Sequence, residues 1–437
     1  MESSIIGRTD RSRASLQDRY TGLIARELYA EEIVWDSDVR LDLSSPHVIL
    51  ICGKRGQGKS YTMGTITEEL IKMNETLQNK ISIIIIDTMG IFYSTKYPNI
   101  NSDEVKWLEQ WGLPPKAFDC KIFVPKGHLN VYSERGLDYD QPFNIRPSEL
   151  SFEDWHLMLD LGDMNDPQSI LLYRILKQIR ADLGDKFDCN DMIEYVGRER
   201  LAATTTKDAL HRRIEGAEDW GILDNEGTQL DSLTIPGQCA IVDVSCFDYR
   251  STGWSIRSLI VAELAKRILR ERMGSRRQEE TLKEKKSHSE IANYTPITWM
   301  LIDEAHQFLP RDARTVASAP LTEWIKQGRQ PGLSLVLATQ QPGALDSSAI
   351  SQCDIVICHR LTASNDVAAL NQINQTYMGK EIRTLLADLS KERGSALVFD
   401  DTSETIKKIR TRPRQSYHGG KEQTVAALNE PEEDSEE

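Results

Sequence analysis

The segment that most restricts how this chain can fold is GKRGQGKS at residues 53–60, which matches the pattern G-x-x-x-x-G-K-[ST]. The apolar run HVILIC, residues 47–52, comes directly before it, and a helical pattern follows. Glycines let the backbone curl so that successive N–H groups face phosphates, while Lys59 adds a positive charge and Ser60 an oxygen for magnesium. The segment therefore predicts a strand, a phosphate loop and a helix. The candidate nucleotide-binding residues are Gly53, Arg55, Gly56, Gln57, Gly58, Lys59, Ser60 and Tyr61.

The composition indicates a globular protein with an acidic exterior. With 437 residues and 39 % hydrophobic content, the chain is long enough for two or three domains of about 150 residues. The net charge of −14 argues against a protein that coats nucleic acid with its whole surface, although a ring can enclose a basic channel. Part of the acid lies in the tail at 421–437, which we expect to be disordered.

Two features favour a cytoplasmic location. No apolar run approaches the roughly 20 residues that cross a bilayer, and the first residues lack the apolar centre of a signal peptide. The seven cysteines form no C-x-x-C pair, and most lie in apolar runs where a thiol behaves as a small hydrophobic group. We expect reduced cysteines that form neither disulfides nor a zinc site, and no membrane anchor.

Short apolar runs recur along the chain and predict the strands of a mainly parallel sheet that is covered on both faces. Between them lie helical patterns such as 254–273, so the predicted class is α/β. The runs are HVILIC (47–52), ISIIIID (81–87), CKIFVP (120–125), QCAIVDV (238–244), ITWMLID (297–303), LSLVLAT (333–339), DIVICH (354–359) and SALVF (395–399).

The remaining segments suggest a division of the chain. Residues 1–45 form a short N-terminal segment with one or two short strands at 33–43, and residues 46–420 form one nucleotide-binding domain. Amphipathic patterns without a strand predict a helical insertion at about 150–230. The charged stretch 276–293 has no apolar face and is expected to be a solvated linker.

Two adjacent carboxylates, Asp303 and Glu304, follow the apolar run that ends at Ile302. Taken alone, they could cap the next helix. Beside a phosphate loop, a second reading is stronger: Asp303 would hold the hydrated magnesium ion, and Glu304 would polarise the attacking water as general base. The letters DEAH at 303–306 also occur in DEAH-box helicases. Those place the acidic motif roughly a hundred residues after the phosphate loop and need a second complete domain, for which no length remains here.

The ordered set of motifs resembles the HerA/FtsK group of P-loop ATPases, and HerA most of all. The matching pieces are GKRGQGKSYTMG, LHRRIEGAEDWGIL, LTIPGQCAIVDVS, LIDEAHQFLP, GRQPGLSLVLATQQPGALDSSAISQCDIVICHRL and IRTRPRQSYHGG. The resemblance implies a RecA-like domain with the helical insertion between the phosphate loop and the Walker B strand. It also implies ATP and Mg²⁺, a homohexameric ring that moves double-stranded DNA, and, for HerA itself, a nuclease partner.

The resemblance also assigns two further residues. Arg329 in QGRQPG matches the arginine that the family extends into a neighbouring subunit, and Gln340 matches the polar residue that senses the γ-phosphate. The candidate catalytic residues are thus Glu304, Arg329 and Gln340, with Ser60 and Asp303 at the metal. Without the resemblance, Arg329 is as well explained as a surface arginine and Gln340 as a strand-end polar residue.

The chain departs from the family at two places. Its phosphate loop begins at residue 53, so the N-terminal β-barrel of HerA proteins is expected to be absent or reduced, which leaves the nuclease partner open. Where HerA typically reads D-P-H-G-E-Y, this chain has DTMGIF at 87–92. Asp87 is then either a supporting site residue or a helix cap.

Three functions remain in competition at this point. The first is a HerA-type DNA translocase or helicase in DNA end processing or genome defence, and the second is a packaging or conjugation pump. The third is a nucleotide-gated hexameric scaffold that regulates an effector nuclease. Basic patches at 198–200, 211–213, 266–277 and 407–414 are candidate DNA contacts, although a solvated helix face or strand edge is the favoured explanation of each.

Overall fold

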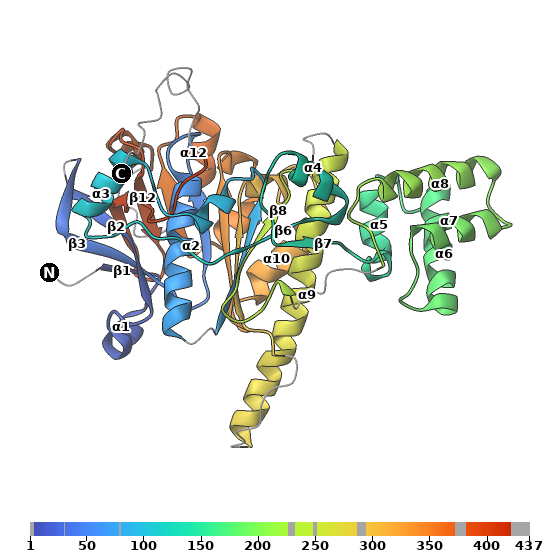
Figure 1. Ribbon diagram of the computed structural model, residues 1–437, viewed down its shortest axis with the longest axis horizontal. Coiled ribbons are helices and arrows are strands. Elements are labelled where there is room, and N and C mark those ends of the chain that lie inside the picture. Colours follow the sequence, from blue (N-terminus) through green and yellow to red (C-terminus); the bar gives the residue numbers. More distant parts are fainter. Residues whose placement is uncertain are drawn as a thin grey trace.

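The computed structural model describes residues 4–29, 31–77, 80–225, 232–247, 251–285, 294–371 and 382–420. The acidic tail at 421–437, expected to be disordered, lies outside these residues. One sheet of thirteen strands runs through the described part of the chain, in the order β1-β3-β2-β13-β12-β11-β4-β10-β9-β5-β8-β6-β7 (Figure 1).

Eight neighbouring strands of this sheet are parallel. Continuous apolar runs favour this arrangement because helices cover both faces of the sheet. All eight predicted strands are present, which confirms the α/β class with a mainly parallel sheet. The parallel strands are β11 (Ile355–His359), β4 (Val48–Cys52), β10 (Leu333–Thr339), β9 (Ile297–Ile302), β5 (Ile81–Asp87), β8 (Cys239–Asp243), β6 (Lys121–Pro125) and β7 (Gln141–Phe143).

The other side of the sheet is antiparallel. Here β12 (Ser395–Asp400) pairs with β11 and with β13 (Thr405–Thr411), and β13 pairs with the hairpin formed by β2 (Thr21–Tyr29) and β3 (Glu32–Asp42). The short strand β1 (Ser4–Ile6) runs parallel to β3, and α1 (Asp10–Leu16) follows it. The N-terminal residues therefore extend the main sheet with strands longer than the sequence suggested.

The two faces of the sheet carry different helices. Ile83 and Ile85 of β5 face a core shared with α2 (Lys59–Thr76), whereas Ile84 and Ile86 face a larger core shared with α9 (Ser251–Glu284) and α10 (Ser318–Gln327). Smaller helices complete the layers. They are α3 (Ser102–Gln110), α4 (Leu129–Glu134), α11 (Ser347–Ser351), α12 (Ser364–Leu370), α13 (Ile382–Ala387), and the 3-10 turns η1 (Phe92–Lys96), η2 (Lys126–His128), η3 (Pro147–Glu149), η5 (Ala305–Gln307) and η6 (Pro342–Ala344).

Four helices fill the expected insertion and project from the side of the sheet opposite the N-terminal strands (Figure 1). They are α5 (Phe152–Met158), α6 (Pro167–Leu183), α7 (Cys189–Arg198) and α8 (Thr204–Glu218). The prediction of a solvated linker at 276–293 is wrong for residues 276–284, because α9 continues to Glu284. Ion pairs of Arg272 with Glu279 at 2.8 Å and of Arg276 with Glu280 at 2.7 Å stabilise this charged extension in place of an apolar face.

The thiols of all seven cysteines are free, and six of them are buried. Their burial among apolar side chains agrees with the structural role expected from the sequence. Among the described residues, no helix combines the length and the apolar character that crossing a bilayer requires.

Candidate nucleotide-binding site

The phosphate loop leaves the sheet at the carboxyl end of β4 and enters α2 at Lys59. Gly56 and Gly58 have φ angles of 74° and 113°, in the region that favours glycine. At Gly53 a Cβ atom would lie 2.5 Å from the Cβ of His359, so a larger residue would collide with β11. The local sequence therefore needs glycine for both backbone geometry and close packing.

His359 of β11 packs against the phosphate loop and hydrogen-bonds to two neighbouring elements. Burial lowers the pKa of His359 to about 4, so its imidazole is neutral at physiological pH. Nδ1 then donates to the carbonyl of Ser395 at 3.0 Å, and Nε2 accepts from the Thr62 hydroxyl at 2.9 Å. This side chain joins α2, β11 and β12 beneath the phosphate loop.

The acidic pair lies at the carboxyl end of β9, two strands from β4. Asp303 and Glu304 are buried, and burial together with the charge of Glu304 raises the pKa of Asp303 to about 7. Glu304 has φ 49°, and its side chain makes no capping hydrogen bond to η5. The helix-cap reading of Glu304 is therefore wrong, and the strained backbone turns its carboxylate toward the phosphate loop side of the sheet.

Gln340 follows β10, the strand between β9 and β4, and contacts Glu304 directly. Its side-chain amide donates to Glu304 Oε1, and its backbone N–H lies 3.5 Å from Oε2. His306 approaches the same carboxylate at 3.4 Å. Glu304 is thus oriented by side chains on both sides of it.

One cavity of about 500 Å³ joins these groups. Of the predicted residues, those that line it are Arg55, Gly56, Gly58, Lys59, Ser60, Tyr61, Asp303, Glu304 and Gln340. Gly53 and Gln57 lie in the loop but do not line the cavity, and the Gln57 carbonyl instead accepts from the Gly394 N–H at 3.1 Å. Burial lowers the pKa of Lys59, while Glu304 and Asp303 oppose this effect.

Arg329 lies away from this cavity. It is exposed in the turn after α10, next to the amino end of β10, whereas Gln340 follows the carboxyl end of the same strand. A strand of this length separates its ends by roughly 20 Å. Within one chain, the structure does not bring Arg329 to Lys59 or Glu304.

The cavity also contains residues that were not predicted to bind nucleotide, among them Arg410, which was considered only as part of the 407–414 basic patch. Arg393 and Arg410 line it from the ends of β12 and β13, Glu104 and Trp107 from α3, and His418 from the C-terminal end of the described chain. Arg410 and His418 lie in the motif IRTRPRQSYHGG, which the resemblance includes without assigning them a role, and no sequence signal pointed to Arg393, Glu104 or Trp107.

We call residues 412–420 the C-terminal strap, because they cross α2 beside the cavity. Arg412 is buried and pairs with Glu68 at 2.8 Å and with Glu69 at 2.7 Å. Burial would raise the pKa of Glu68, but Arg412 and Arg414 outweigh burial and lower it. Arg412 and Arg414 are thus structural, and for these two residues both readings of the 407–414 patch, a solvated surface and a DNA contact, are wrong.

Most cations of the helical insertion remain on its surface. Arg198, Arg200, His211, Arg212 and Arg213 are exposed on or beside α7 and α8. Arg198 pairs with Glu194, and Arg213 donates to the carbonyl of Leu159. The geometry of these cations is compatible with a contact to phosphates, which stays a prediction.

Asp87 at the end of β5 caps the following loop. Its carboxylate accepts from the N–H groups of Met89, Gly90 and Phe92 at 3.2, 2.8 and 2.7 Å. Burial and the neighbouring Asp243 raise the pKa of Asp87 to about 8. The capping reading of Asp87 therefore has structural support.

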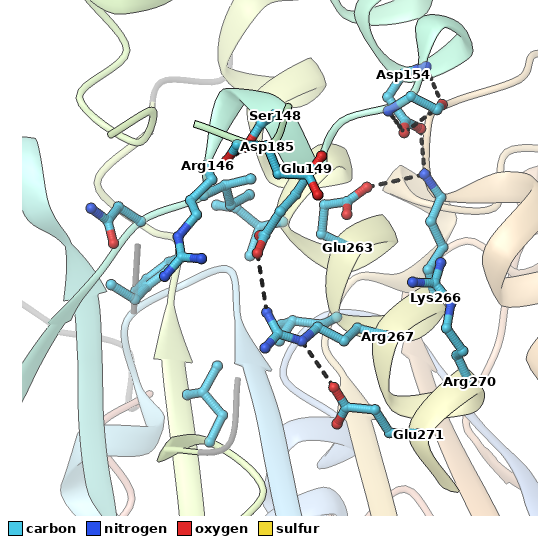
Figure 2. A pocket seen from close by; sticks show the side chains of 17 residues that line it. Arg146, Ser148, Glu149, Asp154, Asp185, Glu263, Lys266, Arg267, Arg270 and Glu271 are labelled. Atoms are coloured by element: carbon cyan, nitrogen blue, oxygen red, sulfur yellow. Dashed lines mark hydrogen bonds and ion pairs between the residues drawn. The ribbon is translucent and has the colours of Figure 1, made fainter. Parts of the chain in front are cut away.

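A second cavity, of about 590 Å³, lies between α9 and the base of the helical insertion (Figure 2). Lys266 of α9 bridges Asp154 at 2.5 Å and Glu263 at 3.0 Å, while Arg267 bridges Glu149 at 3.5 Å and Glu271 at 3.0 Å. The pairs with Asp154 and Glu149 connect α9 to the base of the insertion, whereas the pairs with Glu263 and Glu271 lie within α9.

The phosphate-loop cavity suits a magnesium-bound nucleotide. Ser60 provides a hydroxyl at the start of α2, and Asp303 provides a buried carboxylate whose pKa is raised beside a second carboxylate. Two adjacent buried carboxylates are stabilised when a divalent cation lies beside them. Ser60 and Asp303 are hard oxygen ligands of the kind that magnesium prefers.

Comparisons with known proteins agree with this geometry. Residues 31–268, more than half of the chain, match the family described as "Helicase HerA, central domain". The chain is 23 % identical over 373 residues to the DNA double-strand break repair helicase HerA of Sulfolobus acidocaldarius, covering 84 % of this chain and 63 % of that protein. It is also 23 % identical over 406 residues to a probable helicase of Methanocaldococcus jannaschii, covering 87 % and 68 %.

A solved structure supports the fold. VirB4 of Thermoanaerobacter pseudethanolicus superposes with a TM-score of 0.56 at 14 % identity, over 94 % of this chain and 99 % of that chain. This likeness shows a shared architecture and no more. The chain spans just under two thirds of the Sulfolobus relative, so the activity of that whole protein is not carried over. The family match over the phosphate loop and the strands around it shows that this chain belongs to the HerA central-domain family.

Proposed function

We propose that this chain is an ATP-hydrolysing motor that works as a ring and moves or unwinds double-stranded DNA. The observation that carries the proposal is the single cavity in which Lys59 of the phosphate loop meets the buried pair Asp303 and Glu304 and the Gln340 amide. A phosphate loop alone binds nucleotide, whereas an oriented carboxylate beside it supports hydrolysis.

Each residue has a distinct task in this proposal. Lys59 places its charge on the β- and γ-phosphates, and the loop N–H groups bind the same oxygens. Glu304 accepts a proton from the attacking water, and Gln340 holds the Glu304 carboxylate in position. Ser60 and Asp303 would hold magnesium, which neutralises charge on the phosphate oxygens when bound.

The position of Arg329 supports a composite site between subunits. Arg329 lies at the amino edge of the sheet and the phosphate loop at the carboxyl edge, so it can act only on the nucleotide of another subunit. Such an arginine makes turnover depend on assembly. We propose a homo-oligomer, with six subunits as expected of the family.

DNA would be bound through its phosphates. The exposed cations of α7 and α8 provide local positive charge on a chain with a net charge of −14. Contacts of this kind carry little sequence information. A nuclease or another effector is the proposed partner, in DNA end processing or genome defence.

The test combines hydrolysis with DNA binding. We expect ATP hydrolysis that duplex DNA stimulates, and fluorescence anisotropy should give similar affinities for two unrelated duplexes. Both affinities should fall steeply between about 50 and 200 mM salt, because bound phosphates release counterions. Hydrolysis without any duplex binding at low salt, with an ATP analogue present, would contradict the motor and favour the nucleotide-gated scaffold.

A further inference from the structure

The part of the nucleotide cavity beyond the phosphate loop is lined by rings and one carboxylate. Tyr61 lies in the first turn of α2, Glu104 and Trp107 lie on α3, and Pro413 and His418 belong to the C-terminal strap. The rings of Tyr61 and His418 meet edge to face with centroids 5.3 Å apart. Aromatic faces of this kind are surfaces on which nucleobases stack.

The position of Trp107 is fixed by its neighbours. Its ring lies 6.1 Å from that of Trp35 and 6.4 Å from that of Trp111, with both contacts edge to face. The Arg410 guanidinium carbon lies 5.8 Å from the centre of the Trp107 ring. A salt bridge of 2.9 Å between a guanidinium nitrogen of Arg410 and a carboxylate oxygen of Glu392 fixes this arginine. Trp107 therefore does not need to be ordered when a ligand arrives.

Glu104 is oriented from two directions. The Asn99 side-chain amide donates to its Oε2 at 2.7 Å, and the Tyr61 hydroxyl lies 3.4 Å from the same oxygen. Burial and the charge of Glu104 raise the pKa of Tyr61, so the phenol stays protonated and donates. The Tyr61 oxygen in turn accepts from the backbone N–H of Arg414 at 2.7 Å, which ties the carboxylate to the strap.

An ionised carboxylate only accepts hydrogen bonds, so it distinguishes bases by the donors that they present. Adenine carries an amino group at position 6, whereas hypoxanthine and guanine carry a carbonyl oxygen there. A carboxylate facing that oxygen would leave two acceptors opposed and unsatisfied.

We propose that the base of the nucleotide lies between Trp107, Pro413 and His418, and that Glu104 accepts a hydrogen bond from the 6-amino group of adenine. Glu104 is then the residue that selects ATP, and the strap forms part of the base site. This inference rests on the proposed function, because it concerns the same cavity.

Nucleotide binding provides the test, measured by calorimetry with Mg²⁺ on the full chain. The wild-type protein should bind ATP about tenfold or more tightly than ITP, a preference worth one charge-assisted hydrogen bond. In Glu104→Gln the amide can turn its N–H toward the carbonyl of hypoxanthine. The ratio of ATP to ITP affinity should therefore fall about tenfold, mainly through tighter ITP binding.

Two further variants separate this role from a structural one. Asp103→Asn removes a carboxylate from the same helical turn, but Asp103 is exposed and does not line the cavity, so its ratio should match that of the wild type. Trp107→Ala should weaken ATP and ITP binding by a similar factor, and Trp107→Phe should restore most of the loss.

Four results would overturn the inference. Equal binding of ATP and ITP by the wild-type protein, or an unchanged ratio in Glu104→Gln, would remove Glu104 as the selecting residue while the proposed hydrolysis could stand. Tighter binding of GTP than of ATP would show recognition of a different base edge. Binding of no nucleotide at all would remove the proposed function together with this inference.

Discussion

The side-chain amide of Gln340 donates a hydrogen bond to the carboxylate of Glu304, across the ends of the adjacent parallel strands β10 and β9. The two residues are 36 positions apart in the chain, and the sheet alone brings them together. A carboxylate that is held in this way keeps one orientation without a bound ligand. In the proposed function, binding of the nucleotide and handling of the water are therefore tasks of different residues of the same cavity.

This division predicts different consequences for two substitutions. Lys59→Ala should abolish nucleotide binding, because no other residue supplies the same charge at the start of α2. Glu304→Gln should still bind ATP but lower turnover about 10²- to 10⁴-fold, the usual contribution of a general base. Steady-state hydrolysis and nucleotide binding should be measured on both variants.

A matched control is Glu323→Gln on α10, which alters an exposed glutamate outside the cavity and should leave turnover unchanged. Gln340→Ala should lower turnover with little effect on ATP affinity, because only the orientation of Glu304 is lost. Near-normal hydrolysis in Glu304→Gln would exclude this residue as the base.

The position of Arg329 predicts complementation between inactive subunits. Lys59→Ala subunits retain Arg329 but cannot bind nucleotide. Arg329→Ala subunits retain the nucleotide-binding cavity but supply no arginine to a neighbour. Each variant alone should hydrolyse ATP poorly, whereas mixed rings should recover partial activity. Specific activity of the wild-type protein should also rise with concentration until assembly is complete.

Lys326→Ala near the end of α10 is the control, since it removes an exposed cation close to Arg329 in the sequence. Native mass spectrometry should confirm that subunits exchange. Exchange without any recovered activity, or a monomeric ATPase whose rate is independent of concentration, would exclude a site shared between subunits.

The sequence predicted the parts of the fold that have a local signal. Continuous apolar runs identified the parallel strands, and their carboxyl ends placed Lys59, Glu304 and Gln340 at one edge. The strand β13 was missed because TIKKIRT alternates with lysines and arginine and contains no apolar run. β2 was also missed, because the adjacent charges of Arg26 and Glu27 interrupt its short apolar run in TGLIARELY, although both strands extend the same sheet.

The C-terminal strap shows a second limit of local patterns. Three closely spaced arginines in a polar segment suggest an exposed basic patch, yet Arg412 and Arg414 are fully buried. The carboxylate that compensates Arg412 is Glu68, 344 positions away, so no local pattern indicates the pair. For the same reason, no local pattern indicated that Glu104 or His418 would line the cavity.

The strap predicts a large stability effect at Arg412. Arg412→Met leaves Glu68 and Glu69 buried with one cation fewer and should lower the free energy of unfolding by about 3–5 kcal/mol. Urea unfolding would measure the change. Lys408→Met on β13 is the matched control, because the ammonium group of this lysine donates to the carbonyl of Asp388 in an exposed contact, and the substitution should cost less than about 0.5 kcal/mol. Equal small effects of both substitutions would contradict a strap that depends on the buried ion pairs.

A buried histidine predicts how stability depends on pH. His47 lies before β4, with Nδ1 2.6 Å from a carboxylate oxygen of Asp354 and Nε2 3.8 Å from one of Asp42. Burial lowers the pKa of His47, but the two aspartates outweigh burial and raise it from the ordinary 6.5 to about 9. Folding therefore favours the protonated form, so the stabilisation is complete below pH 6.5 and is lost as pH rises through 9.

The pKa difference corresponds to about 3 kcal/mol at roughly 1.4 kcal/mol per unit. The free energy of unfolding should be measured by urea titration at several values between pH 6 and 9.5. In His47→Gln, the uncharged side chain leaves Asp42 and Asp354 without their shared cation, so the protein should be less stable at pH 6. The slope between pH 6.5 and 9 should become shallower by the contribution of His47, while the raised pKa values of Asp87 and Asp303 keep part of it. His211→Gln, on the exposed face of α8, should keep the wild-type slope. A slope in His47→Gln equal to that of the wild type would show that His47 does not contribute to the pH dependence and is not the ion that joins the end of β3 to the start of β11.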